Sequence, residues 1–384
     1  YQYLAPDLTV VLVPSLSLML QTIREWTANT TVGFRFLPVC SDAKVTEDKR
    51  PGEDPDLTVG DLSVLDAPAT TDVDTIAGFL RLDEPRVVFC TYQSSDVLAD
   101  ACAAAGARFG LVVADEAHRT TGKASGVFAT VLDEERFPAE RRLFMTGTPR
   151  TFAAAKDGDE TVQSMDDTDT YGEVAYQLGF GAAVDLGLLA NYEVVVIAID
   201  DPTLRTMVLA GGSVELAGLE RRIDVSALVS LEGALRAVDE FDMSRLLSFH
   251  SRIKAATDWA SAIPTFQKWR GHGWDAEADT VNGTMNASKR KDRIGWLKKA
   301  TDKPRVLTNA RCLAEGVDVP SLDGIVFADP RRSQVDIVQA VGRVMRKDPD
   351  RSGKVGRIVV PVVVPDPDSV DGDNVFRDSA FKPI

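Results

Sequence analysis

Short apolar runs alternate with amphipathic stretches through the first 150 residues of the chain. Apolar runs bounded by Gly, Pro or charged residues are typical of strands buried on both faces of a parallel sheet. They predict strands at 8–13, 34–39, 86–91, 110–114 and 142–146. The stretches between them predict helices at 16–27, 71–82, 95–105 and 124–132. Strands that alternate with helices predict an α/β fold with right-handed crossovers between parallel strands.

The second half of the chain repeats this alternation. Its apolar runs predict strands at 192–199, 245–249, 277–281, 305–308, 323–328 and 357–364. Residues 203–243 have a helical pattern and form an insertion before the strand at 245–249, and residues 334–346 predict a further helix. The two halves therefore predict two separate parallel sheets.

Three acidic stretches lack any apolar periodicity. Residues 43–61 predict a surface loop, residues 151–172 a mobile connection, and residues 365–373 an acidic linker. We therefore expect four parts: a first domain over 1–150, a linker over 151–190, a second domain over 191–364 and an acidic tail over 365–384.

The length of 384 residues and the hydrophobic content of 44% are sufficient for two cores. No apolar run approaches the roughly 18 residues of a membrane-spanning helix, so we expect no membrane partner. The first residues do not have the pattern of a secretory signal. The four cysteines share no C-x-x-C spacing, which predicts reduced thiols and no zinc site. These features predict a cytoplasmic protein.

The most distinctive polar residues directly follow the strand at 110–114. They form the tetrad Asp115-Glu116-Ala117-His118. This is the carboxyl end of a strand, where open parallel sheets bind their ligands. Adjacent carboxylates suit a magnesium nucleotide, because one can hold hydrated Mg²⁺ while the other orients or deprotonates the water that attacks the γ-phosphate. An isolated acid pair is more typical of a solvated turn, and it is the downstream segments that favour the nucleotide site.

Three further segments follow the tetrad in a fixed order. Residues 143–150 read Leu-Phe-Met-Thr-Gly-Thr-Pro-Arg, residues 306–320 combine a strand with a Gly-Val-Asp turn, and residues 339–346 read Gln-Ala-Val-Gly-Arg-Val-Met-Arg. Together with the tetrad, these segments resemble motifs II, III, V and VI of the superfamily 2 helicases and translocases, which include the DEAD/DEAH-box proteins. The residues of these motifs are most similar to those of the type III restriction-enzyme motor subunits and the type ISP restriction-modification helicases.

Other segments extend the resemblance over most of the chain. Residues 10–18 look like motif Ia, residues 89–94 like the next nucleic-acid-contacting segment, and residues 246–252 like motif IV. The resemblance implies two RecA-like lobes, each a parallel sheet with flanking helices. It implies an ATP-dependent helicase or translocase core of a restriction or defence protein, with ATP and Mg²⁺ as cofactors. It also implies nucleic acid as the partner, with DNA favoured and RNA left open, and further domains or subunits beyond both termini. Unwinding and translocation without unwinding both stay open.

The resemblance assigns catalytic roles to five residues. It implies that Asp115 organises the metal and that Glu116, also a metal-site residue, is the catalytic base. It implies that Gln339 senses the γ-phosphate and that Arg343 and Arg346 reach it as arginine fingers, because a guanidinium forks onto phosphate oxygens. The alternative for these arginines is a solvent-facing helix over a buried stripe of Val338, Val341 and Val344, and the two interpretations are compatible.

Further roles follow from the same motifs. Gly316 and Asp318 would line the nucleotide, since glycine permits close approach of the backbone. His118, Thr146 and Thr148 would couple the nucleotide state to the nucleic-acid track.

The implied nucleic-acid contacts are Pro14, Ser15, Thr91, Thr308 and Asn309. Hydroxyls and backbone amides at strand ends hold a nucleic-acid strand by its phosphates and do not read its sequence. For the hydroxyls, a role in an ordinary turn or helix cap is the open alternative.

The net charge of −15 is unusual for a nucleic-acid-binding protein, because phosphate binding depends on cationic neutralisation. One stretch nevertheless concentrates cations, at Lys289, Arg290, Lys291, Arg293, Lys298, Lys299, Lys303 and Arg305. Such a run is either a solvated helix face or a surface that faces nucleic acid. Its position beside the segment 306–320 favours the second interpretation.

One expected motif is missing from these residues. Phosphate binding in this class uses Gly-x4-Gly-Lys followed by Ser or Thr, and neither Gly122-Lys123 nor Gly353-Lys354 fits that spacing. We therefore expect a first lobe that is truncated at its N-terminus and a chain that is catalytically incomplete by itself. The missing loop leaves open a non-hydrolysing nucleic-acid-binding or scaffold module. A nuclease is disfavoured, because no second cluster of acids and lysine marks a separate metal site.

Overall fold

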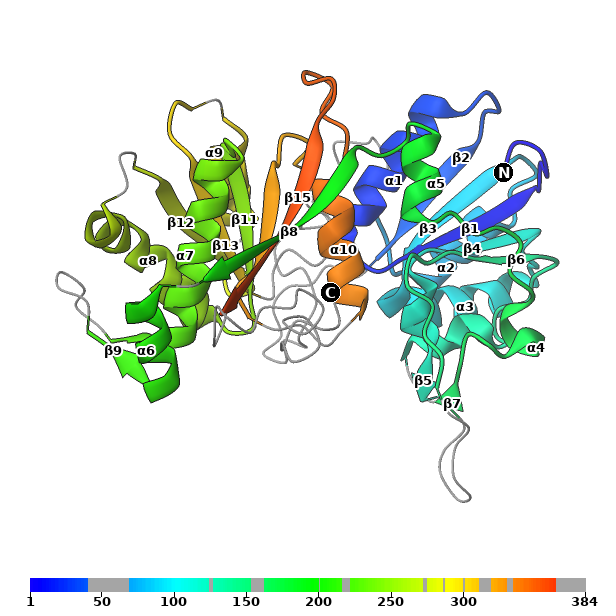
Figure 1. Ribbon diagram of the computed structural model, residues 1–384. Coiled ribbons are helices and arrows are strands. Elements are labelled where there is room, and N and C mark those ends of the chain that lie inside the picture. The colour runs from blue at the N-terminus through cyan, green and yellow to red at the C-terminus, as the bar shows by residue number, and fades with distance from the viewer. Residues whose placement is uncertain are drawn as a thin grey trace. The chain divides into compact units, whose positions relative to one another are not determined.

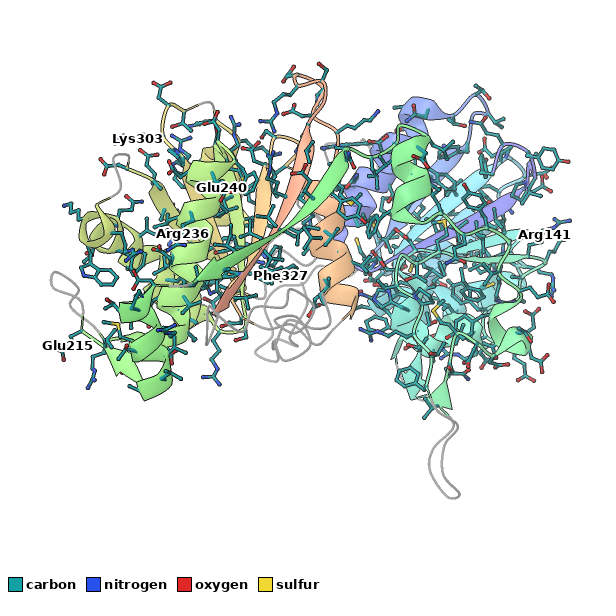
Figure 2. The ribbon with its side chains drawn as sticks, in the orientation of Figure 1. Arg141, Glu215, Arg236, Glu240, Lys303 and Phe327 are labelled. Atoms are coloured by element: carbon teal, nitrogen blue, oxygen red, sulfur yellow. The ribbon has the colours of Figure 1, made fainter. Side chains whose placement is uncertain are left out.

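The computed structural model describes residues 1–40, 69–123, 127–152, 162–199, 201–215, 222–271, 275–285, 287–299, 301–310, 319–329 and 334–363. The chain divides into two compact units, Tyr1–Tyr176 and Gln177–Ile384 (Figure 1). Exposed charged side chains such as Arg141 and Lys303 lie on the outside of their units (Figure 2). Among the described helices, none combines the length and the hydropathy needed to cross a bilayer.

The first unit contains a five-stranded sheet in the order β2-β3-β1-β4-β6. Its strands are β1 (Leu8–Val13), β2 (Arg35–Val39), β3 (Arg86–Thr91), β4 (Leu111–Ala114) and β6 (Arg142–Phe144), and all neighbours pair in parallel. The register aligns Val13 with Thr91 and Leu12 with Ala114. The carboxyl ends of β1, β3 and β4 therefore lie at one edge of this sheet.

Both faces of this sheet are buried. Along β1, Val10 and Leu12 belong to the core on one face, and Val11 and Val13 to the core on the other. The flanking elements are the helices α1 (Leu16–Asn29), α2 (Val73–Leu80) and α3 (Ser95–Ala105) and the 3-10 turns η2 (Tyr92–Ser94), η3 (Ala117–Thr120) and η4 (Val127–Leu132). Burial on both faces explains why the predicted strands are continuous apolar runs.

The second unit contains a six-stranded parallel sheet in the order β12-β13-β11-β14-β15-β8. Its strands are β8 (Asn191–Ile199), β11 (Arg245–His250), β12 (Glu277–Asn282), β13 (Arg305–Ala310), β14 (Gly324–Phe327) and β15 (Val355–Val363). Its main helices are α7 (Val225–Glu240), α8 (Ile253–Arg270), α9 (Ala287–Lys298) and α10 (Gln334–Val344). Two cores again cover the two faces, since Leu246 and Leu247 belong to opposite ones. The predicted α/β class with two parallel sheets is confirmed.

The predicted helical insertion at 203–243 is interrupted by a short hairpin. Helix α6 (Pro202–Ala210) ends before Gly211 and Gly212, whose φ angles are 68° and 82°. The antiparallel strands β9 (Ser213–Val214) and β10 (Ile223–Asp224) separate it from α7. Two consecutive glycines with positive φ stop a helix, which is the reason for the difference.

The stretch 151–172, predicted as a mobile connection, contributes structure to the first unit where it is described. Strand β7 (Val162–Gln163) pairs antiparallel with β5 (Gly122–Lys123), and the turn α4 (Thr168–Tyr171) follows. Met165 packs against a core of the first unit, and the Tyr171 ring lies 5.0 Å from that of Phe144. These apolar residues anchor an otherwise acidic stretch. The next helix, α5 (Phe180–Asp185), packs on the second unit through Phe180 and Val184.

Candidate active site

The acidic tetrad begins where β4 ends. The Asp115 amide donates to the Leu12 carbonyl at 3.0 Å and extends the ladder of β1 by one bond. The Tyr92 hydroxyl donates to the Asp115 carbonyl at 2.7 Å, and the Glu116 amide donates to the Asp115 Oδ1 at 2.9 Å. The chain turns away from the sheet at this point and enters η3.

Glu116 has an unusual backbone conformation. Its φ of 49° and ψ of 44° lie in the left-handed region. For a residue other than glycine this conformation costs roughly 1 kcal/mol or more, and strain of this kind concentrates at functional sites. The side chain is 25% exposed. The turn therefore presents a partly buried carboxylate at the sheet edge.

His118 contacts Glu116 and is buried. Its Nδ1 lies 3.3 Å from Glu116 Oε2, 3.0 Å from Thr146 Oγ1 and 3.3 Å from Thr148 Oγ1. The Thr148 amide also donates to Thr146 Oγ1 at 3.1 Å. Four residues that the motifs predicted as one site are thus in contact, because β4 and β6 are neighbours and their ends coincide.

The acid pair suits a metal that arrives with its nucleotide. Asp115 and Glu116 are both half-buried at the strand end. Within the part of the chain that the structure describes, no cluster of three or more His, Cys, Asp or Glu side chains could hold a metal ion. Proteins commonly hold Mg²⁺ through one or two carboxylates together with substrate phosphates.

The predicted nucleic-acid contacts of the first unit gather at the same sheet edge. Pro14 is buried, and Ser15 caps α1 by accepting the Leu18 amide at 3.3 Å. The Thr91 hydroxyl is buried and donates to Ser94 Oγ at 3.3 Å. The capping and turn roles left open for these hydroxyls are present in the structure, and contact with nucleic acid stays a prediction.

The predicted nucleic-acid and nucleotide contacts of the second unit are either buried or outside the described residues. Thr308 is completely buried, and its hydroxyl donates to the Ala256 carbonyl of α8 at 3.0 Å. In this position the hydroxyl holds a helix against the sheet. Asn309 is also buried. Gly316 and Asp318 lie outside the described residues.

Helix α10 carries the predicted glutamine and arginines. Its buried stripe is formed by Ile337, Ala340, Val341 and Val344, whereas Val338 is only half-buried. Gln339 is half-buried and Arg343 is 8% exposed, so Arg343 is not a solvent-facing residue. Arg346 lies just beyond the helix end and is half-buried. The apolar stripe and the predicted catalytic Arg343 therefore lie on one helix.

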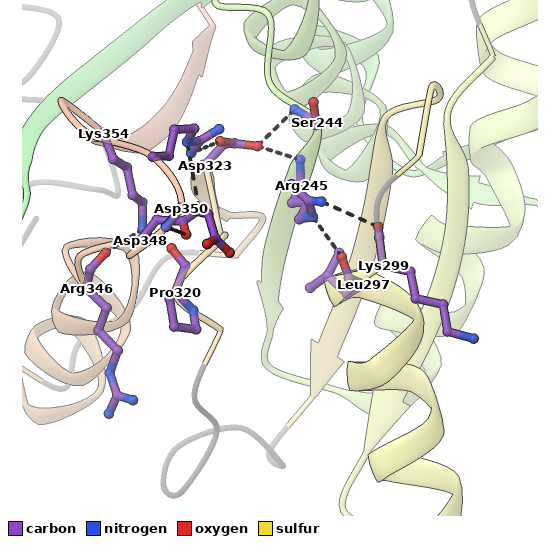
Figure 3. A network of polar contacts seen from close by, with 11 residues as sticks. Ser244, Arg245, Leu297, Lys299, Pro320, Asp323, Arg346, Asp348, Asp350 and Lys354 are labelled. Carbon is purple, nitrogen blue, oxygen red and sulfur yellow. Dashed lines mark hydrogen bonds and ion pairs between the residues drawn. The ribbon is translucent and has the colours of Figure 1, made fainter.

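A polar network holds the C-terminal end of α10 (Figure 3). Lys354 is buried, and its Nζ donates to the carbonyls of Arg346 at 2.7 Å and Pro320 at 2.6 Å. The Arg346 guanidinium extends away from Lys354 (Figure 3). Nearby, buried Asp323 accepts the amides of Ser244 at 3.0 Å and Arg245 at 2.8 Å.

Arg351 completes this Asp323 network by an ion pair with the carboxylate. The contacts of Lys354 explain why Gly353-Lys354 is not a phosphate loop, because the Lys354 ammonium is bound to two carbonyls. Sequence patterns gave no signal for Asp323 or Lys354, because most of their partners are main-chain groups.

A close backbone contact also lies at the end of α10. At Gly356, a Cβ atom would lie 2.6 Å from the Val344 carbonyl, so the end of α10 rests on the bare backbone of β15.

Comparison with known proteins identifies the family. Residues 3–151 match the family described as "Type III restriction enzyme, res subunit", and residues 234–348 match "Helicase conserved C-terminal domain". The chain belongs to superfamily 2 of the helicases. A probable helicase of African swine fever virus is 28% identical to this helicase chain over 284 residues, which are 72% of the chain and 28% of the viral protein.

Two solved structures resemble the helicase chain over 98% of its length. The ATP-dependent Type ISP restriction-modification enzyme LlaBIII bound to DNA is 28% identical, with a TM-score of 0.73 and 25% of its own chain covered. A nuclease-deletion mutant of the Type ISP enzyme LlaGI, in complex with a DNA substrate mimic, is 26% identical, with a TM-score of 0.60 and 24% covered. The prediction of two RecA-like lobes is confirmed. The helicase chain spans about a quarter of the length of these relatives.

Three of the eight cations in the basic run pair with acids in β12 or just before it. Arg293 forms an ion pair with Asp279, Arg305 lies 2.9 Å from Glu277, and Lys303 lies 3.8 Å from Asp275. Alternate residues of a strand share a face, so Glu277 and Asp279 meet Arg305 and Arg293 on one face of β12. For these three cations the structure favours the paired surface over a surface that faces nucleic acid.

Proposed function

We propose that the chain is the ATP-dependent motor core of a DNA restriction or defence protein, and that it couples ATP hydrolysis to movement along DNA. The observation that carries the proposal is the contact of Glu116, His118, Thr146 and Thr148 at the carboxyl end of β4. The two DNA-bound type ISP relatives support DNA as the partner.

In this proposal Asp115 holds Mg²⁺ and Glu116 accepts a proton from the attacking water. When bound, the metal supplies neutralisation of charge on the phosphates. His118 contacts both the base and the two threonines, so a change at Glu116 would reach Thr146 and Thr148 through His118. The proposed role of Arg343 and Arg346 is to neutralise charge that builds on the γ-phosphoryl group. Gln339 on the same helix senses that group.

The test is Glu116→Gln in the full-length protein. We expect ATP binding to persist and turnover to fall by about 10²-fold or more, the scale of losing a general base. Steady-state ATPase assays with and without DNA measure this, and the exposed Glu135→Gln is the matched control. Normal turnover in Glu116→Gln would refute the assignment.

A non-hydrolysing nucleic-acid-binding module is the second candidate, favoured by the missing Gly-x4-Gly-Lys motif. It predicts DNA binding that is independent of ATP and no turnover in the unmodified full-length protein. A filter-binding assay beside the ATPase assay distinguishes the two candidates.

A further inference from the structure

The peptide unit between Asp115 and Glu116 is held at both of its polar ends. Its carbonyl, beyond the last residue of β4, accepts the Tyr92 hydroxyl at 2.7 Å. Its N–H, which belongs to Glu116, donates to the Asp115 carboxylate at 2.9 Å. The C=O and N–H groups point from opposite edges of one rigid plane, so the two bonds together fix the orientation of that plane.

This orientation determines the backbone of the predicted base. Rotation of the peptide plane changes ψ of Asp115 and φ of Glu116 together. The φ of 49° at Glu116 is unfavourable for a residue with a side chain. A flip of the plane would relieve this strain, but it would turn the carbonyl away from Tyr92 and the N–H away from Asp115.

Tyr92 is well suited to hold the plane. Its side chain is completely buried in a core of the first unit and packs edge-on against Phe128 with ring centroids 5.5 Å apart. A tyrosine hydroxyl is protonated at neutral pH, since its ordinary pKa is about 10. The Tyr92 hydroxyl is therefore available as a donor to the Asp115 carbonyl.

We propose that Tyr92 is a positioning residue for Glu116, because its hydroxyl holds the Asp115–Glu116 peptide in the orientation that directs the Glu116 carboxylate toward His118 and the attacking water. The inference rests on the proposed ATPase function. Tyr92 does not touch the reacting atoms, and it acts through the main chain of the base.

The test compares Tyr92→Phe with Tyr171→Phe in the full-length protein. Both substitutions keep an aromatic ring and remove one hydroxyl bonded near the same turn, since the Tyr171 hydroxyl lies 2.9 Å from Thr120 Oγ1. Only the Tyr92 bond acts on the Asp115–Glu116 peptide. We expect Tyr92→Phe to lower kcat by about tenfold with an unchanged KM for ATP, because the base is misplaced only for the chemical step. Tyr171→Phe should stay within about twofold of the unsubstituted enzyme.

Crystal structures of the unsubstituted protein and Tyr92→Phe supply a readout that is independent of activity. We expect φ of Glu116 to become negative in Tyr92→Phe and to remain positive in the unsubstituted protein. A kcat equal to that of Tyr171→Phe, or a positive φ in Tyr92→Phe, overturns the inference. Absence of any turnover in the unsubstituted protein refutes the proposed function instead, and the φ comparison still tests the role of Tyr92 in holding the peptide.

Discussion

The turn after β4 and the C-terminal end of α10 hold predicted catalytic residues by different means. The turn in the first unit uses hydroxyls and main-chain groups, namely those of Tyr92, Thr146, Thr148 and Thr120. The helix end in the second unit uses the buried charged groups of Asp323 and Lys354 together with Arg351.

The two kinds of contact should differ in how much they contribute to the free energy of unfolding. A neutral hydrogen bond contributes only about 0.5–1.5 kcal/mol net, so its loss leaves a fold intact. Removal of the buried Asp323 carboxylate leaves two main-chain amides without their acceptor, and each unsatisfied buried donor costs about 1–3 kcal/mol. We therefore expect substitutions at the turn to change rates and substitutions in the Asp323 network to change the free energy of unfolding.

The largest effect is expected from Asp323→Ala, which leaves Arg351 and two main-chain amides without their acceptor. The free energy of unfolding of the second unit should fall by about 3 kcal/mol, mainly because the two amides lose their acceptor. Urea denaturation followed by circular dichroism measures it. The exposed Asp302→Ala is the control and should change it by less than about 0.5 kcal/mol. A loss below about 1 kcal/mol in Asp323→Ala would contradict the proposed contrast between the two regions.

A smaller effect is expected at the arginines of α10. Arg343→Ala or Arg346→Ala should lower ATP turnover by about tenfold or more while DNA affinity stays nearly constant, because transition-state contacts act on rate more than on ground-state binding. Melting temperatures show whether removal of the buried Arg343 also loosens the unit. The adjacent exposed Lys347→Ala serves as the control cation. Normal hydrolysis with weakened DNA binding would make these arginines track residues.

The smallest effect concerns pH, which should affect the charged second unit more than the hydroxyl-lined turn. The Leu204 amide and the Arg270 guanidinium hold the pKa of Asp201 below its ordinary value of 3.8. This carboxylate therefore stabilises the fold fully above its ordinary pKa, and the contribution is lost as pH falls through the lower folded value. The difference in unfolding free energy between the unsubstituted protein and Asp201→Asn should shrink as the pH is lowered below about 4. A difference that stays constant down to pH of about 2 would rule out this titration.

Local patterns were sufficient for most of the two sheets. The strand expected at 86–91 is β3 over the same residues, because a strand buried on both faces is a continuous apolar run. The two-residue strands β5 and β7 were not predicted, since each is too short for a period and they pair across some 40 positions. Tyr171 likewise gave no signal, because it packs on the first unit from an acidic stretch.

In the candidate site, too, the sequence predicted the grouping of residues but not the orientation of their hydroxyls. Glu116, His118, Thr146 and Thr148 come together because they follow two adjacent strands, and the order of motifs was enough to group them. Their assigned roles stay predictions. The orientation of a hydroxyl was not predictable: the Thr308 hydroxyl bonds to the Ala256 carbonyl, which depends on the packing of α8. The Tyr92 hydroxyl is bound to a main-chain carbonyl in the same way.

The contact at Gly356 means that a substitution at this position would change the distance between α10 and its sheet. With the Val344 carbonyl so close, even one added methyl group has no space, and a side chain at 356 must push the end of the helix outward. Arg343 and Arg346 would move with it while every charge is conserved. A series from Gly to Ala to Ser at this single position would act as a graded spacer, and it would turn the geometry of the two arginines into a variable that can be set independently of their chemistry.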